Sequence, residues 1–285
     1  MHNLLLAIFF SSCIIVTFRL FSILRIDNLQ AITANYLIAA ILSFIIWNGD
    51  WSFSELPSRS WFPLSIVNGV FFILVFFVFA RSAQKAGVAI TAVASKMSVI
   101  IPVGIGFLIY GDHVNILKIA GILTAFPAFY LIFKRKNKSI EPSKKYILLP
   151  LILFLGTGTN DSVMKHAQKF YVGDEYLLFL GVVFSFSLFI GMGFLIHKLI
   201  KTRQSISPRN IVAGFLLGFF NFASTYFFLK GLAVFESSVF FPIFNVSIVS
   251  MGALIGLVIF KEILWWKNWL GIILAIITIL LIAMA

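Results

Sequence analysis

The chain carries the stretch GFLIYGD at residues 106–112 and the related stretch GLVIFKE at residues 256–262. In each copy a glycine opens an apolar run and an acidic residue, Asp112 or Glu262, closes it. The offset of 150 residues between 106 and 256 aligns other parts of the chain without gaps. These further matches are Phe72 with Phe222, Phe77 with Phe227, Ala83 with Ala233, Gly121-Ile122 with Gly271-Ile272, and Leu131-Ile132 with Leu281-Ile282. Apolar residues match by chance in such a chain, so the glycines and the acidic pair carry most of the evidence for an internal repeat.

The composition around this repeat indicates lipid as the solvent. Of 285 residues, 61% are apolar and 11% are charged, whereas soluble domains have roughly 45–50% apolar and about 25% charged residues. The 34 phenylalanines would give a soluble protein large exposed apolar patches. We therefore expect an all-α polytopic membrane protein.

Ten apolar stretches are long enough to be spans, since crossing the hydrocarbon takes roughly 20 residues of helix. They are residues 4–24, 31–47, 62–80, 88–110, 116–133, 146–165, 176–196, 211–229, 237–260 and 264–284. Each must be helical because lipid offers no partner to the backbone.

The most polar stretch, residues 134–145, divides these spans into a first repeat at residues 1–133 and a second at residues 146–285. Because a repeat of five spans is odd-numbered, its second copy runs through the membrane in the opposite direction. The sequence thus predicts two inverted five-helix repeats, an architecture typical of secondary transporters.

The basic residues behind the net charge of +12 indicate how the chain is oriented in the membrane. In a soluble protein it would raise the question of nucleic acid, but here most Lys and Arg lie in the short gaps after odd-numbered spans, where they contact anionic lipid. We expect the bilayer and no nucleic acid as partner. The positive-inside rule makes the linker at residues 134–145 cytoplasmic and puts both termini in the periplasm of an inner membrane.

The two repeat endings resemble the G-x-x-x-x-G-E motif of EamA-type permeases of the drug/metabolite transporter superfamily, and the resemblance covers the whole chain. Asp112 in place of Glu, Lys261 in place of Gly, and the absence of a basic tail depart from the pattern. The resemblance implies ten helices in two five-helix repeats and alternating access to a cavity lined by spans one, three, four, six, eight and nine. It also implies cytoplasmic termini, which conflicts with the loop charges.

Two of the ionisable residues inside the predicted spans, Lys96 and Asp161, are candidate site residues. Lys96, beside Ser95 in span four, is a candidate for binding an anionic group of a substrate, or it extends to the interface. Asp161 in span six follows the run Gly156-Thr157-Gly158-Thr159-Asn160. It is a candidate partner of Lys96 or a proton acceptor, or it forms an i to i+4 pair with Lys165.

Amides and prolines add further candidates. Asn68, Asn221, Asn245 and Tyr226 lie in cavity-lining spans by the resemblance and are predicted to contact substrate, although amides also link helices. Asn245 aligns with Ser95 in the repeat. The predicted hinge residues are Pro102, Pro242, Gly156 and Gly158. The prolines are alternatively static bends, whereas the glycines are expected to loosen their helix.

The sequence favours a non-enzymatic secondary transporter or facilitator of amino-acid-like or other zwitterionic or anionic metabolites. The four histidines lack metal-ligand spacing and no phosphate-binding loop occurs, so no metal and no cofactor are expected. Cys13 has no partner for a disulfide within the chain. A non-transporting scaffold and a lipid-modifying membrane enzyme remain the alternatives, and a second copy of the chain is a candidate partner.

Overall fold

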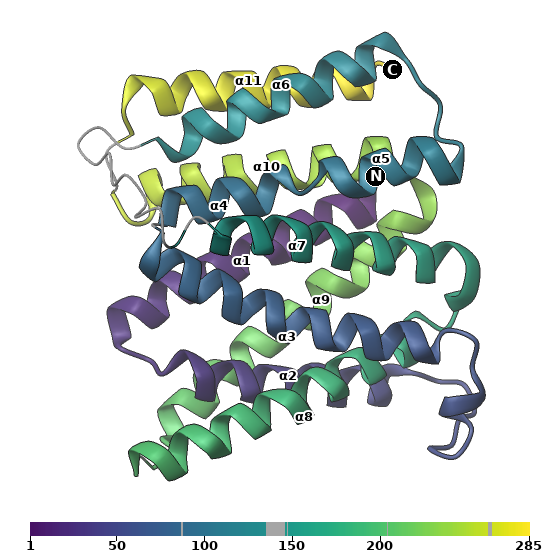
Figure 1. Ribbon diagram of the computed structural model, residues 1–285, viewed down its shortest axis with the longest axis vertical. Coiled ribbons are helices and arrows are strands. Elements are labelled where there is room, and N and C mark those ends of the chain that lie inside the picture. Colours follow the sequence, from purple (N-terminus) through teal and green to yellow (C-terminus); the bar gives the residue numbers. More distant parts are fainter. Residues whose placement is uncertain (87, 135–145, 147, 204, 262–263) are drawn as a thin grey trace. The chain divides into compact units, whose positions relative to one another are not determined.

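The computed structural model describes the chain except for residues 87, 135–145, 147, 204 and 262–263 (Figure 1). The predicted basic linker and Glu262 therefore lie outside the described residues, apart from Lys134. The long helices are α1 (His2–Leu24), α2 (Asn28–Ile46), α3 (Phe62–Lys85), α6 (Ile116–Phe133), α7 (Leu148–Ala167), α8 (Tyr176–Thr202), α9 (Pro208–Val234), α10 (Ser237–Val258) and α11 (Trp266–Ala283). The shorter ones are the 3-10 turn η1 (Leu56–Ser58), α4 (Val88–Met97), α5 (Ile100–Ile105), and the π-helical turns η2 (Gly106–Tyr110) and η4 (Gln168–Val172).

Each predicted span is mostly helical, and the described residues contain no strand. Eight helical segments of the described chain are long and apolar enough to cross a membrane. Two predicted spans fall short of this measure. The apolar part of α6, Ile116–Ile132, is shorter, and α7 contains the polar run 156–161. The chain is thus a helical multi-pass protein, and the full set of ten spans stays a prediction.

The chain divides into two compact units. Unit 1 contains Met1–Ile73 and His166–Ala233, and unit 2 contains Leu74–Lys165 and Val234–Ala285. Each unit therefore combines segments from both predicted repeats. The division of the chain into compact units therefore differs from its division into sequence repeats.

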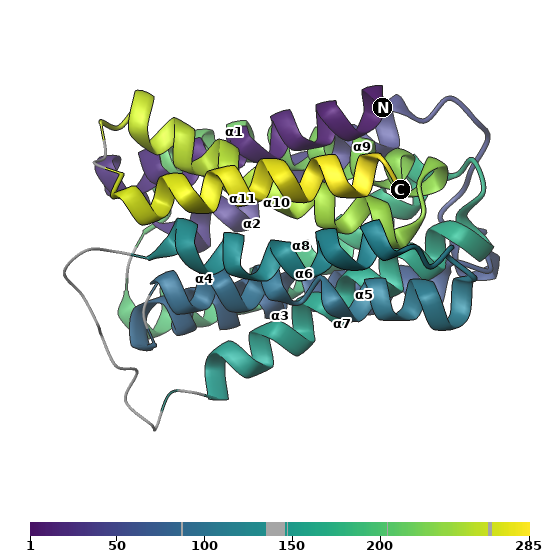
Figure 2. The ribbon, with the colours of Figure 1, turned by 90° about the horizontal axis from the view of Figure 1, so that it is seen from above.

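In unit 2, α6 and α11 lie side by side (Figures 1 and 2). A Cβ atom on Gly121 of α6 would lie 2.5 Å from Cγ1 of Ile282, and one on Gly271 of α11 would lie 2.8 Å from Cγ1 of Ile132. The start of each helix thus meets the end of the other, so the two run antiparallel. The repeat offset converts the first contact into the second, which makes the interface reciprocal, like that between two copies related by a twofold axis.

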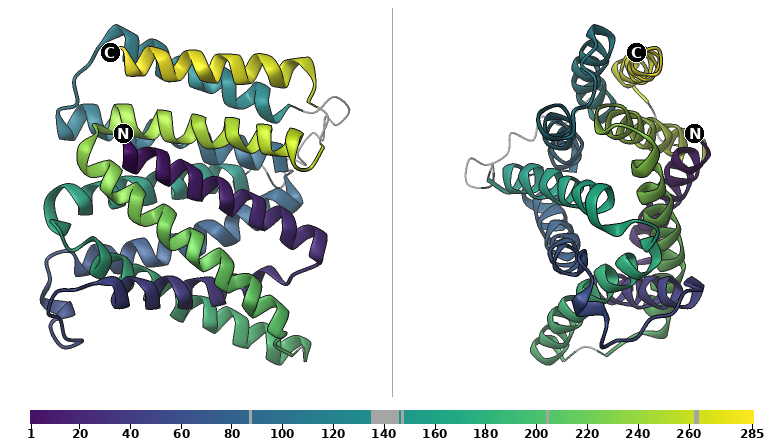
Figure 3. Two further views of the ribbon diagram at one scale, coloured as in Figure 1. Left: turned by 180° about the vertical axis from the view of Figure 1, so that it is seen from behind. Right: turned by 90° about the vertical axis from the view of Figure 1, so that its right-hand side faces the viewer.

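In unit 1, α2 and α8 form the corresponding pair (Figure 3). Gly181 packs against the ring of Phe44, and Gly191 lies near Thr33, so these helices are antiparallel too. Asp27 caps α2 by accepting hydrogen bonds from the N–H groups of Leu29 and Gln30, at 3.0 and 3.1 Å, and it forms an ion pair with Lys198 of α8.

Burial raises the pKa of the Asp27 carboxyl, but the hydrogen bond from Lys198, the two backbone donors and the Lys198 charge together lower it by more. The pKa therefore lies below its ordinary value. Asp27 is ionised at neutral pH, and its carboxylate can serve as both helix cap and ion-pair partner.

The start of α10 in unit 2 is held by two acidic side chains. Asp112 Oδ2 accepts a hydrogen bond from the Ser238 N–H at 2.8 Å, and Glu236 forms an ion pair with the buried Lys118. Burial raises the pKa of Glu236, but Lys118 and His113 lower it by more, so it lies below its ordinary value. Asp112, which closes the first repeat motif, thus caps the helix that carries the second motif.

The reciprocal glycines give the first prediction. Gly271→Ala should destabilise the protein by about 1–3 kcal/mol, because its Cβ would lie 2.7 Å from the backbone nitrogen of Ile132. Gly193→Ala is the matched control, since nothing lies within 4 Å of its Cβ position. Thermal unfolding in detergent measures both variants. Equal midpoints for the two would contradict tight packing at this interface.

Candidate functional site

The segment predicted as span four is interrupted in its middle. Helix α4 ends at Met97, Ser98 and Val99 form a turn, and α5 begins at Ile100. Pro102 explains where the break falls, because proline has no N–H to donate to the carbonyl four residues earlier and its ring clashes with that carbonyl. The carbonyl in question belongs to Ser98.

The backbone groups at the break find other partners. The Ser98 carbonyl accepts from the N–H of Ile101 at 3.0 Å, and the Ser98 hydroxyl donates to the Ser95 carbonyl at 2.6 Å. The Val99 N–H bonds to the Lys96 carbonyl at 3.4 Å. Most backbone N–H and C=O groups at the break therefore have hydrogen-bond partners within the chain. Non-helical backbone at membrane depth requires such partners.

Lys96 lies in the last turn of α4, directly before this break. Its Nζ donates a hydrogen bond to Oδ1 of Asn245 in α10 at 3.0 Å. Asn245 is buried, and its Nδ2 donates to the Phe241 carbonyl at 3.0 Å. The structure thus brings together two predicted substrate-binding residues, Lys96 and Asn245, with Ser95 adjacent in α4.

Asp161 of α7 is the acidic residue of this cluster, and it lies near enough to Lys96 for the two groups to interact electrostatically. The neighbouring Gly158 fits α7 against the break, since a Cβ there would lie 2.4 Å from Ile101 Cδ1 and 2.9 Å from the Ser98 carbonyl. Thr157, one turn before Asp161, has a buried hydroxyl without a hydrogen-bond partner among the described residues. We call Lys96, Asn245, Asp161 and Thr157 the broken-helix site.

The glycines of α7 were expected to loosen the helix and to act as hinges. In the structure α7 is continuous from Leu148 to Ala167, and a hinge role for Gly156 and Gly158 stays a prediction. A Cβ atom on Gly156 would lie 3.2 Å from Cγ2 of Val75, and a Cβ atom on Gly158 would lie still closer to its neighbours. Their small size lets neighbouring residues approach closely, and it does not unwind the helix.

Lys165 was the alternative partner of Asp161. Its Nζ donates to the Phe235 carbonyl at 3.2 Å. The charge of Lys96 acts on Asp161, and a pair between Asp161 and Lys165 stays the alternative prediction. Pro242 lies inside the continuous helix α10. A hinge role for either proline stays a prediction.

The remaining candidates lie in unit 1. Asn68 of α3 is fully buried, and Asn221 of α9 accepts from the Thr225 hydroxyl of its own helix at 3.4 Å. Tyr226, also on α9, lines a cavity of about 330 Å³ in that unit. Sequence reasoning did not find the other lining residues, nor Thr157 in unit 2. The Ser98 break had one available signal, Pro102 four residues later.

Comparisons with known proteins support the family resemblance. The model of the EamA-like transporter family matches residues 144–284. The chain therefore carries an EamA-like domain over nearly all of its predicted second repeat, as the sequence motifs indicated.

One relative and one solved structure extend the comparison beyond this domain. An uncharacterized protein of Haemophilus influenzae is 26% identical over 280 residues, covering 96% of this chain and 94% of that protein. The crystal structure of another protein superposes on this chain with a TM-score of 0.78 and 11% sequence identity. The match covers 98% of this chain and 94% of the other. At that identity the likeness concerns the fold alone.

The contact between Lys96 and Asn245 gives the second prediction. Lys96→Met and Asn245→Leu should each destabilise the protein by about 1–3 kcal/mol, because each leaves a buried polar partner unsatisfied. In the double variant the loss should be smaller than the sum by about 0.5–2 kcal/mol. Unfolding midpoints of the four proteins in detergent measure this coupling, and strictly additive effects would argue against the bond.

Proposed function

We propose that this EamA-like membrane protein is a secondary transporter or facilitator that moves small zwitterionic or anionic metabolites, amino-acid-like solutes among them, across the inner membrane. The broken-helix site is the observation that carries the proposal. Charged residues within spans are costly and typically mark a transport pathway. Interrupted helices that present charges and helix ends are a recurring form of transporter binding site.

The donors of Lys96 support recognition of an anionic group. An ammonium has three N–H donors, and in the described part of the chain Asn245 uses one of them. The other donors are available to a carboxylate or phosphate of the substrate. Asp161 and the Thr157 hydroxyl supply acceptors nearby, which suits a solute that also carries an amine.

The proposed mechanism is alternating access between two inverted five-helix repeats. It draws support from the antiparallel pairs α2 with α8 and α6 with α11, since inverted repeats require equivalent helices to run in opposite directions. It also draws support from the reciprocal contacts of Gly121 with Ile282 and Gly271 with Ile132. Pro102 is the proposed hinge, because the helix is already interrupted between α4 and α5.

The proposal keeps the orientation given by the loop charges, with basic loops in the cytoplasm and both termini in the periplasm. Asn221, Asn68 and Tyr226 stay proposed substrate contacts. No catalytic role is proposed, and a dimer of this chain is left to experiment.

Transport in proteoliposomes is the third prediction. With a library of labelled amino acids and organic anions, Lys96→Gln should lower the flux of the transported solute roughly tenfold or more, because a charge-assisted hydrogen bond is lost. Lys201→Gln, at an exposed position in the last turn of α8, is the matched control and should transport normally. A scaffold would transport nothing, and unchanged flux in Lys96→Gln would remove the broken-helix site from the mechanism.

A further inference from the structure

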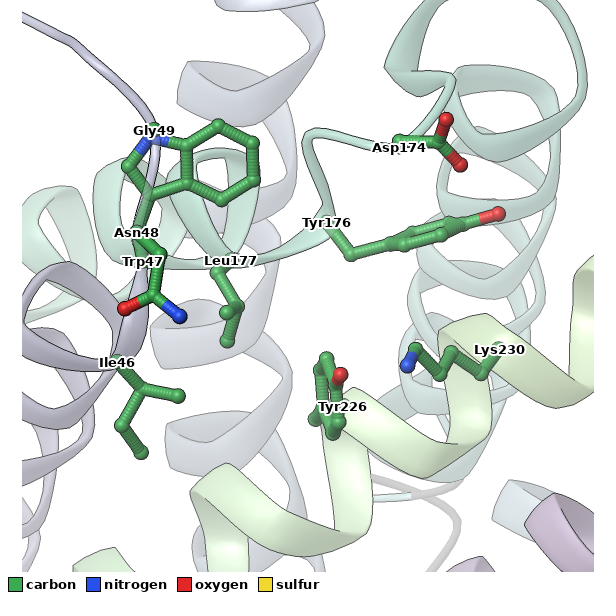
Figure 4. Close-up of a pocket in the computed structure, with 9 residues that line it drawn as sticks. All are labelled: Ile46, Trp47, Asn48, Gly49, Asp174, Tyr176, Leu177, Tyr226 and Lys230. Atoms are coloured by element: carbon green, nitrogen blue, oxygen red, sulfur yellow. The ribbon is translucent and has the colours of Figure 1, made fainter.

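Unit 1 contains a second place with the chemistry of a binding site. The cavity of about 330 Å³ lies where α2 ends, α8 begins and α9 approaches its end (Figure 4). Its functional side chains are Trp47 after α2, Asp174 and Tyr176 at the start of α8, and Tyr226 and Lys230 on α9. We call this cavity the Trp47–Lys230 pocket. Its size is at the small end of the range for ligand pockets, so an amino-acid-sized solute suits it better than a larger one.

Two opposite charges line this pocket without neutralising each other. Asp174 and Lys230 form no ion pair in the part of the chain that the structure describes. Lys230 Nζ instead lies 4.6 Å from the centroid of the Tyr226 ring, a cation–π contact. Both charges are thus available to a ligand that carries the complementary charges.

The aromatic side chains add an apolar surface to this pocket. The Tyr226 ring stacks on Phe222, with centroids 6.0 Å apart and planes at 10°, which fixes its position. Tyr176 adds a second ring to the lining (Figure 4). The indole Nε1 of Trp47 is buried and has no acceptor among the described residues. It lies on the side of the ring next to Gly49, away from Lys230, so Trp47 lines the pocket with its ring carbons (Figure 4).

We infer that the Trp47–Lys230 pocket is a second binding site, for a small zwitterion that carries an aromatic or flat apolar group. Lys230 binds its carboxylate, Asp174 binds its ammonium, and Tyr226 and Tyr176 contact its ring. An aromatic belt at the membrane surface would explain the Trp and Tyr residues, but it does not require two opposite charges that line one pocket without pairing. The inference rests on the proposed function only for the class of solute.

The test is binding of labelled L-phenylalanine to the purified full chain, by equilibrium dialysis, in a Lys96→Gln background that weakens the broken-helix site. Lys230→Met and Asp174→Asn should each weaken binding at least tenfold, because each removes a charge-assisted contact. Lys201→Met is the matched control and should bind normally. Unchanged affinity in the Lys230 and Asp174 variants, or no saturable binding in the background protein with a normal elution profile, would overturn the inference.

Competitors identify which features the pocket recognises. Phenethylamine lacks the carboxylate, 3-phenylpropionate lacks the amine, and phosphoethanolamine, the free headgroup of a zwitterionic lipid, lacks the ring. Each should compete at least tenfold more weakly than L-phenylalanine. Equal competition by phosphoethanolamine would assign the pocket to a lipid headgroup and overturn the inference. Failure of the proposed function appears separately, as unchanged flux in Lys96→Gln.

Discussion

The structure depends on one constraint, which is that backbone N–H and C=O groups in hydrocarbon must be satisfied within the chain. This requirement makes the apolar segments helical and restricts where a helix can be interrupted. At Ser98 and Val99 the interruption is tolerated because a hydroxyl and shortened turns replace the lost helical bonds. The break then places the Lys96 ammonium at the carbonyl end of a half-helix, where a positive charge is favourable.

The break also lies near positions that are equivalent in the two proposed repeats. The repeat offset pairs Asn245 with Ser95 and Lys96 with Val246, so the bond from Lys96 to Asn245 joins nearly equivalent positions of the two proposed repeats. Contacts between equivalent positions occur close to the axis that relates two copies. In the proposed transporter, this axis is where a substrate site can be exposed to either side with little rearrangement.

The sequence predicted a large part of this description, and the missing part has physical reasons. Helix positions follow from apolar runs, and the correspondence of Gly121 with Gly271 follows from the 150-residue repeat, because both can be read from the sequence without knowledge of the packing. Pro102 signalled the break, but the partner of Asp161 depended on how α7 packs on α4 and α5. The close approach of Ser98 and Ile101 to Gly158 depended on the same packing, since a glycine that allows close approach looks in sequence like one that loosens a helix. The Trp47–Lys230 pocket joins the ends of three helices, and no spacing along the chain reveals it.

Labelling of single cysteines in the native membrane tests the inverted repeat most directly. Cys13→Ser removes the one native thiol. Val114→Cys before α6 and Trp266→Cys at the start of α11 then introduce thiols at equivalent ends of two repeat-related helices, both at exposed positions. Inverted repeats predict that the two cysteines are labelled from opposite sides. With the proposed orientation, a membrane-impermeant maleimide reaches Val114→Cys from the periplasm of intact cells and Trp266→Cys only after the membrane is opened. Labelling of both cysteines from the same side would contradict the account.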